Sequence, residues 1–233
     1  METLTDAMVN ALLLLIGGDA ELWEIIGISV RVSTLAILFA TPPAILVAFL
    51  LAYGRFPGRR VLISVFSTLL SVPAVVVGLT FYLLLSRQGP LGNWQLLFTQ
   101  TAMILGQIAL CFPILVAMGH SALQSADQRA WETARTLGAG PFRALLTVMR
   151  EVRFGLLAAL LAAYGRIIAE IGTSMMLGGN ILHYTRNIPT AIALETSKGN
   201  FAQGIALGLV LLVLAFSLNI FLHHLQGRGQ WTG

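Results

Sequence analysis

The sequence predicts an all-α integral membrane protein with about five transmembrane helices and one helix-turn-helix on the cytoplasmic side. Three observations predict this fold class: few charged residues, long apolar runs, and arginines that gather in the loops of one side. Charged residues make up 10% of the 233 residues, whereas soluble domains have about 25%. Residues 1–233 are therefore interpreted as a single transmembrane domain.

The expected spans follow from runs that contain no Asp, Glu, Lys or Arg. These runs are residues 32–54, 61–86, 88–126 and 199–227. Each exceeds the roughly 20 residues that a helix needs to cross the hydrocarbon. A further apolar tract is interrupted only by Arg166 and Glu170. The predicted spans are residues 23–53, 61–85, 98–120, 154–179 and 201–225.

Residues 1–20 precede the first span and are expected to form a short helix at the membrane surface. Leu4, Met8, Leu12 and Leu15 form an apolar stripe at helical spacing. Within the spans, prolines are expected to kink the helices that contain them, at Pro42–Pro43, Pro73 and Pro113.

The basic residues predict the orientation of the chain. Nine arginines fall in loops or tails of one side: Arg55, Arg59, Arg60, Arg129, Arg135, Arg143, Arg150, Arg153 and Arg228. The opposite side has only Arg87, Arg186 and Lys198. Because cytoplasmic loops are enriched in Lys and Arg, the N-terminus is expected outside and the C-terminus in the cytoplasm. Topology thus accounts for the net charge of +4, and no nucleic-acid partner is expected.

Cysteine and histidine give no sign of a metal site. The one cysteine, Cys111, excludes a disulfide framework and a cysteine-based metal centre. The four histidines lie near the ends of the expected spans, and His223–His224 has no acidic neighbour in sequence. An intramembrane protease or similar enzyme would need a nucleophile with a base inside the bilayer, so this alternative is remote.

The longest cytoplasmic segment, residues 121–153, is expected to be an ordered helix-turn-helix. Ser125 and Gln128 match a capping box, and Trp131, Ala134 and Leu137 form a helical stripe that stops at Gly138. Pro141 suits the first turn of a second helix, which is expected over residues 142–150. Two interpretations remain open: an amphipathic hairpin on the bilayer, or a docking element for a cytoplasmic partner.

Residues 131–139, Trp-Glu-Thr-Ala-Arg-Thr-Leu-Gly-Ala, resemble the E-A-A-x-x-x-G-A cytoplasmic loop of ABC importer permeases. Residues 170–181 resemble the fourth-span motif of molybdate, sulfate and tungstate permeases, and residues 184–199 are most similar to tungstate permeases. The resemblance covers essentially the whole chain. Two departures are Thr133 in place of Ala, and Arg150–Glu151 where many members have Leu-Pro.

The resemblance implies a type I ABC importer permease of a prokaryotic cytoplasmic (inner) membrane. It implies that Glu132, Thr133, Ala134, Gly138 and Ala139 couple this chain to an ATPase subunit. The implied partners are a second copy of the chain, two cytoplasmic ATP-binding subunits, an extracellular or periplasmic oxyanion-binding protein, and the lipid bilayer. Tungstate is the expected substrate, with molybdate or sulfate as the alternative.

No cofactor is expected on this chain, and the chain itself is not expected to be an enzyme. A P-loop requires G-x-x-x-x-G-K-[ST], but the only lysine, Lys198, has no such glycines before it. ATP and Mg are therefore expected on the partner subunit.

Three charged residues in the expected spans are candidates for a substrate pathway. Arg166 lies 12 residues after Phe154, roughly 18 Å into the bilayer at a rise of about 1.5 Å per residue. Glu170 follows four residues later, so the two can pair on one helical face. Either they form a structural buried pair, or they line the pathway. Arg31 either snorkels to the outer interface or attracts an incoming anion.

Overall fold

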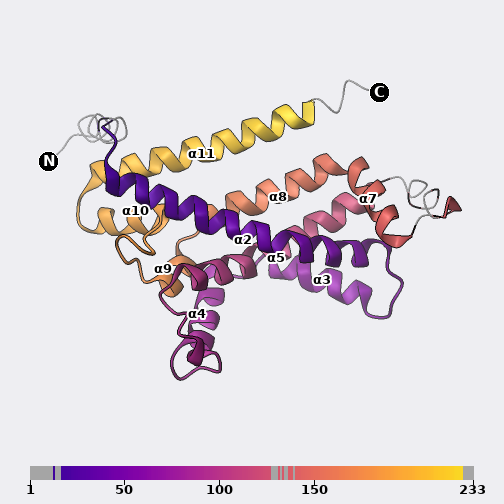
Figure 1. Ribbon diagram of the computed structural model, residues 1–233, viewed down its shortest axis with the longest axis horizontal. Helices are drawn as coiled ribbons and strands as arrows, with labels where there is room; N and C mark the ends of the chain where they lie inside the picture. The colour runs from indigo at the N-terminus through magenta and orange to yellow at the C-terminus, as the bar shows by residue number, and fades with distance from the viewer. Residues whose placement is uncertain are drawn as a thin grey trace. The chain divides into compact units, whose positions relative to one another are not determined.

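A computed structural model describes residues 13, 17–126, 131, 133, 136–138 and 140–227 of the chain (Figure 1). All regular elements in these residues are helical, which confirms the predicted all-α fold class. In order they are α2 (Ala20–Tyr53), α3 (Arg59–Leu69), α4 (Ala74–Leu85), the 3-10 turn η1 (Gly92–Trp94), α5 (Gln100–Gln124), α7 (Pro141–Glu151), α8 (Arg153–Ile168), α9 (Gly172–Gly178), α10 (Ile188–Ser197) and α11 (Phe201–Gly227). The predicted surface helix falls largely outside the described residues.

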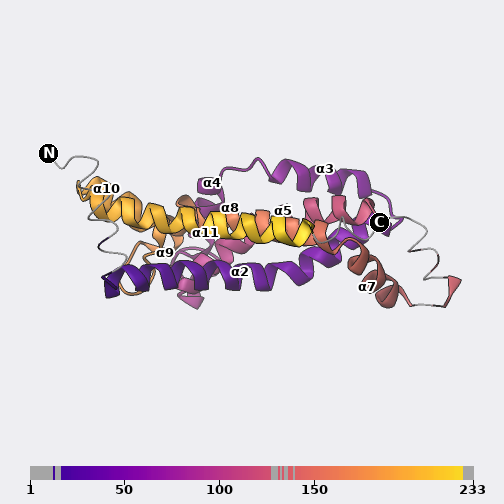
Figure 2. The same cartoon turned by 90° about the horizontal axis from the view of Figure 1, so that it is seen from above.

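Each expected span falls on a helix or on a bent pair of helices. By length and composition, α2 and α5 are each sufficient to cross a membrane, with mean hydropathies of 2.4 and 2.1. The pairs α3 with α4 and α8 with α9 are sufficient only when each bent pair is counted as one span (Figures 1 and 2). The second and fourth expected spans are therefore not single helices, and the total of five spans stays a prediction.

Proline and a polar side chain mark the two breaks. Pro73 has φ −63° and ψ 132° and stands immediately before α4; its missing N–H and its ring disfavour continuation of the preceding helix. Glu170 lies in the other break, between α8 and α9. Pro42, Pro43 and Pro113, in contrast, lie inside α2 and α5, which run through them without interruption.

The chain divides into two compact units, each assembled from separate stretches of sequence. The first unit comprises Met1–Ala36, Pro73–Leu110 and Gly165–Leu218; the second comprises Ile37–Val72, Cys111–Tyr164 and Asn219–Gly233. The interpretation of residues 1–233 as one transmembrane domain stays a prediction.

In the first unit, the beginning of α2 packs against α10 and α11. The buried side chains of this cluster are Leu22, Ile25, Ile26, Ile188, Ala191, Ala206 and Leu207. In the same unit α9 lies against α4 and α5, and glycines permit the close approach. A Cβ on Gly106 of α5 would stand 2.4 Å from Thr173 Cγ2. Such small residues are typical of helix contacts in membranes.

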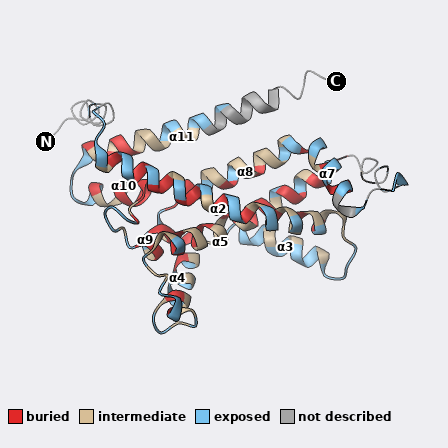
Figure 3. Cartoon of the chain, viewed as in Figure 1, coloured by how far each residue is buried: buried red, intermediate tan, exposed pale blue. Residues whose placement is uncertain are grey.

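In the second unit, the end of α2 packs with the ends of α5, α7 and α8. Its buried cluster consists of Ala48, Leu123, Ala126, Val148 and Val152. By contrast, α3 has no buried residue, and it is drawn largely as exposed or intermediate in Figure 3. Its exposed side chains include Val61, Leu62 and Val65. An apolar surface of this kind suits lipid or another protein rather than water.

Candidate functional site

Of the helix-turn-helix predicted for residues 121–153, the structure describes the glycine turn and the second helix, whereas most of the first helix lies outside the described residues. Gly138 has φ +83°, the left-handed conformation that glycine adopts at low cost. Gly140 is the N-cap of α7, and Pro141 stands in its first turn, as the sequence predicts. Thr133 is helical and exposed. Glu132, Ala134 and Ala139 lie outside the described residues.

One local expectation for this segment stays a prediction, and another differs from the structure. The Ser125 hydroxyl donates to the carbonyl of Ala122 at 2.7 Å, and its expected capping partner Gln128 lies outside the described residues. Trp131 is half-buried, whereas Leu137 is 82% exposed. The predicted apolar stripe therefore does not lie on one buried face. Trp131 packs on the helical bundle, whereas Leu137 projects from it.

Trp131 attaches the segment to α2. Its ring stacks on Tyr53 with 4.8 Å between centroids, and it meets Phe49 edge-on at 5.3 Å. Tyr53 donates its hydroxyl hydrogen to the carbonyl of Leu123 on α5 at 3.0 Å. Aromatic pairs of this geometry contribute about 0.5–1.5 kcal/mol beyond area burial. We call Phe49, Tyr53 and Trp131 the aromatic clasp.

Arg166 and Glu170 form the ion pair that their spacing predicts. The break after α8 gives Glu170 a second partner, since its Oε1 accepts the backbone N–H of Gly172 at 2.9 Å. The carboxylate thereby binds an otherwise unpaired donor at the start of α9. Its side chain is 9% exposed, whereas that of Arg166 is 46% exposed. Glu170 is held inside the protein, whereas the side chain of Arg166 is partly exposed.

Ser174 on α9 is a candidate nucleophile close to this break. The hydroxyl of Ser174 is buried without a hydrogen-bond partner in the described part of the chain. A nucleophile requires a base within hydrogen-bond reach, so the geometry gives the intramembrane-enzyme alternative no support. Arg31 lies exposed on α2, and its role stays a prediction.

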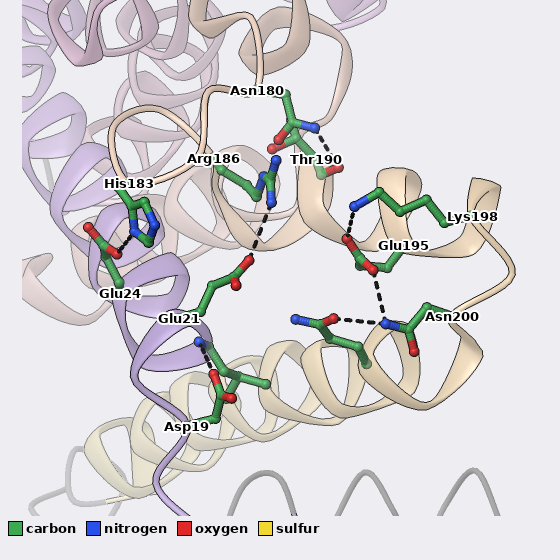
Figure 4. Close-up of polar contacts among 12 residues, drawn as sticks. Asp19, Glu21, Glu24, Asn180, His183, Arg186, Thr190, Glu195, Lys198 and Asn200 are labelled. Carbon is green, nitrogen blue, oxygen red and sulfur yellow. Dashed lines mark hydrogen bonds and ion pairs between the residues drawn. The ribbon is translucent and has the colours of Figure 1, made fainter.

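The structure brings together a polar cluster that the sequence analysis did not identify (Figure 4). His183 Nδ1 lies 2.5 Å from Glu24 Oε2, and Arg186 Nη1 lies 3.4 Å from Glu21 Oε1. The two pairs join the segment after α9 to the beginning of α2. Nearby, the Ser29 hydroxyl accepts the backbone N–H of Ile188 at 2.6 Å. The partners lie about 160 residues apart in the chain, so no local pattern could have indicated them.

Glu195 is the most enclosed carboxylate of this cluster. Its side chain is 7% exposed; Oε1 accepts from Lys198 Nζ at 2.8 Å and Oε2 from Asn200 Nδ2 at 3.0 Å. The hydrogen bond from Lys198 is the main cause that lowers the pKa of Glu195; burial opposes it, and Asn200 and the charge of Arg186 add to it. The carboxylate therefore ties the end of α10 to the beginning of α11.

This geometry predicts an acid-sensitive contribution to stability. A carboxylate whose pKa is lowered by folding stabilises the fold above its unfolded pKa of about 4.3, and the contribution is lost as the pH falls through the folded value. Glu195→Gln should therefore lower the melting temperature of the purified protein at pH 7. Below about pH 4 the deficit relative to the wild type should shrink. A deficit that stays constant across this range would contradict the role assigned to Glu195.

The two long apolar helices and the two bent pairs of apolar helices define a polytopic helical membrane protein. The chain belongs to the family of binding-protein-dependent transport system inner membrane components, whose model matches residues 33–228. It is therefore a permease component of the inner membrane, and the resemblance noted in the sequence is confirmed.

Curated relatives extend over nearly the whole chain. The tungstate uptake system permease protein TupB of Campylobacter jejuni is 39% identical over 97% of this chain and 95% of its own length. TupB of Peptoclostridium acidaminophilum is 37% identical over 97% of this chain and 99% of its own. The molybdenum transport system permease protein ModB of Escherichia coli K12 is 33% identical over 73% of this chain and 78% of its own length.

Solved structures support the fold. A chain of a bacterial ABC transporter involved in the import of alginate superposes with a TM-score of 0.76 at 19% identity, covering 97% of this chain and 84% of that one. A chain of the MetNI methionine ABC transporter superposes with a TM-score of 0.65 at 15% identity, covering 92% of this chain and 95% of that one. This chain thus has the fold of ABC importer permeases, as the sequence predicts.

Proposed function

We propose that this chain is the permease subunit of an ATP-driven tungstate importer. The observation that carries the substrate is the likeness to two tungstate permeases over 97% of this chain, at 39% and 37% identity. The match to the molybdenum permease, at 33%, covers 73% of the chain. Molybdate is therefore the nearest alternative and sulfate a further one. The anion crosses by alternating access and is not chemically changed.

The proposed complex contains two copies of this chain, two cytoplasmic ATP-binding subunits and a periplasmic oxyanion-binding protein. One copy offers few helices to enclose a path, so a second copy across a two-fold axis completes it. ATP and Mg belong to the ATP-binding subunits. Glu132, Thr133, Ala134, Gly138 and Ala139 form the coupling surface, and the exposed Leu137 supplies its apolar contact.

Coupling proceeds through the aromatic clasp. Closure of the ATP-binding subunits moves the helix-turn-helix, and Trp131 transmits the movement to Tyr53 and thence to Leu123. The bundle then switches between outward-open and inward-open states by rigid-body movement. Arg166, whose guanidinium is partly exposed, provides a favourable field for a dianion, while Glu170 holds it in position. Arg31 attracts the incoming anion at the outer side.

Co-purification tests the partnership. This chain should co-purify with an ATP-binding subunit expressed from the same cells. Leu137→Asp should remove that subunit from the complex, because a carboxylate replaces an apolar contact that is buried on docking. Ser197→Asp, on the opposite side in the proposed topology, is the matched control and should not. Loss of the subunit with both variants, or with neither, would refute docking at Leu137.

Cysteine labelling tests the topology. In a Cys111→Ser background, Gly140→Cys and Ser197→Cys place single thiols at two exposed positions. With the N-terminus outside and the C-terminus in the cytoplasm, only the thiol at position 197 should react with a membrane-impermeant reagent in intact cells. After the cells are opened, both should react. Equal labelling in intact cells would contradict the proposed orientation.

A further inference from the structure

An apolar cavity of about 300 Å³ lies in the second unit, among α2, α5, α7 and α8. Its aliphatic lining includes Ile45, Leu115, Met149, Leu157 and Leu160. Cavities of this size are at the lower end of those that bind small ligands. The lining therefore suits a hydrocarbon chain rather than an ion.

Among the described residues, two polar side chains border the cavity, Thr41 and Arg153. The Thr41 hydroxyl donates to the carbonyl of Ile37 at 2.6 Å, so its hydrogen is already used within α2. Arg153 is exposed, and its guanidinium carbon lies 4.8 Å above the ring of Phe154. A cation–π contact of this kind orients the guanidinium without neutralising its charge.

Arg153 stands at a boundary in the sequence. It is the first residue of α8, and the next charged residue of that helix is Arg166. The apolar residues that come after Arg153 in α8 line the cavity, namely Leu156, Leu157 and Leu160. Leu160 lies seven residues beyond Arg153, roughly 10 Å along the helix. An exposed positive charge thus stands at one end of an apolar cavity.

We propose that this cavity binds one acyl chain of an anionic phospholipid whose phosphate pairs with Arg153. A molecule with an anionic head and an apolar tail satisfies both parts of the lining, and basic pockets between transmembrane helices are suited to such lipids. The flexible thioether of Met149 adapts to a chain that is itself flexible. The assignment to the cytoplasmic leaflet rests on the topology in the proposed function.

A second copy of this chain is a weaker occupant on charge grounds. An apolar helix placed over the cavity would cover Arg153 without offering it an anion, and an unpaired charge is costly to bury. A phosphate at this position forms charge-assisted hydrogen bonds with the guanidinium, frequently bidentate. Charge complementarity therefore favours the lipid.

Lipid retention tests the proposal on the intact purified complex. The protein is equilibrated with equal amounts of phosphatidylglycerol and phosphatidylethanolamine, and the lipid that remains bound is identified by native mass spectrometry. The wild type should retain several-fold more phosphatidylglycerol. Arg153→Gln should abolish that preference, whereas Arg60→Gln, an exposed arginine outside the lining, should keep it.

A cavity-filling variant tests the tail. Leu157→Trp should displace both lipids, whereas Leu46→Trp, at an exposed residue of α2 outside the lining, should not. The proposal would be overturned if Arg153→Gln retained as much phosphatidylglycerol as the wild type. It would also be overturned if Leu157→Trp dissociated a dimer of this chain while the lipid stayed bound. If Leu157→Trp fails to fold, the arginine pair decides alone. Retention is measured without transport, so failure of tungstate uptake leaves this result interpretable.

Discussion

Gly138→Val should reduce uptake by at least about tenfold while the chain still inserts in the membrane. The wild-type glycine has φ +83°, and left-handed backbone costs an ordinary residue about 1–2 kcal/mol, with more strain for a β-branched one. No described residue lies within 4 Å of a Cβ built at this position, and the cost is assigned to the backbone conformation. The turn should change conformation and redirect the segment before α7.

Two variants control this prediction. Gly138→Asn should retain most of the activity, because asparagine tolerates the left-handed conformation. Gly140→Val places the same side chain two residues away, where φ is −62° and no described residue lies within 4 Å of an added Cβ, and it should be tolerated. The measurements are uptake in cells and stimulation of ATPase activity by the binding protein. Equal losses from valine at positions 138 and 140 would refute the role of the turn.

The second large effect is expected at the break between α8 and α9. Glu170→Gln retains an oxygen for the N–H of Gly172 but removes the charge that pairs with Arg166. We expect a loss of about 1.5–3 kcal/mol in stability, the range for hydrogen bonds to charged groups. Adding Arg166→Met removes the uncompensated guanidinium, so the double variant should recover much of that loss.

Uptake by the double variant separates the two interpretations of this pair. If Arg166 serves only to anchor Glu170, the folded double variant should transport normally. If its exposed guanidinium provides a field for the anion, as we propose, the double variant should fold but transport poorly. A stable double variant with full uptake would exclude the pathway role. Thermal unfolding in detergent measures the first property, and cellular tungsten measures the second.

Local chemistry explains which features could be predicted from the sequence. The left-handed turn at Gly138 and the start of α7 at Pro141 follow from residues whose backbone preferences are strong. The Arg166–Glu170 pair follows from their spacing, but the break that gives Glu170 a second partner does not. An apolar run of adequate length is compatible with one helix or two. The sequence alone indicated a break at Pro73 but gave no reason to expect one at Glu170.

Features that depend on distant parts of the chain were missed. The contact of Trp131 with Phe49 and Tyr53 requires knowledge of where α2 ends relative to the helix-turn-helix. The pairs of His183 with Glu24 and Arg186 with Glu21 depend on tertiary packing across most of the chain. Charged residues near span ends had an ordinary interfacial explanation, so sequence alone gave no reason to pair them.

Competitive uptake is the most direct test of the assignment to a tungstate importer. Cells that lack this chain, with and without its restoration, receive tungstate and molybdate at equal low concentrations, and cellular tungsten and molybdenum are measured. Restoration should recover tungsten accumulation, excess sulfate should leave it largely unaffected, and the Gly138→Val chain should not recover it. Recovery of molybdenum without tungsten would contradict the proposed substrate, and recovery of neither would contradict import of these oxyanions by this chain.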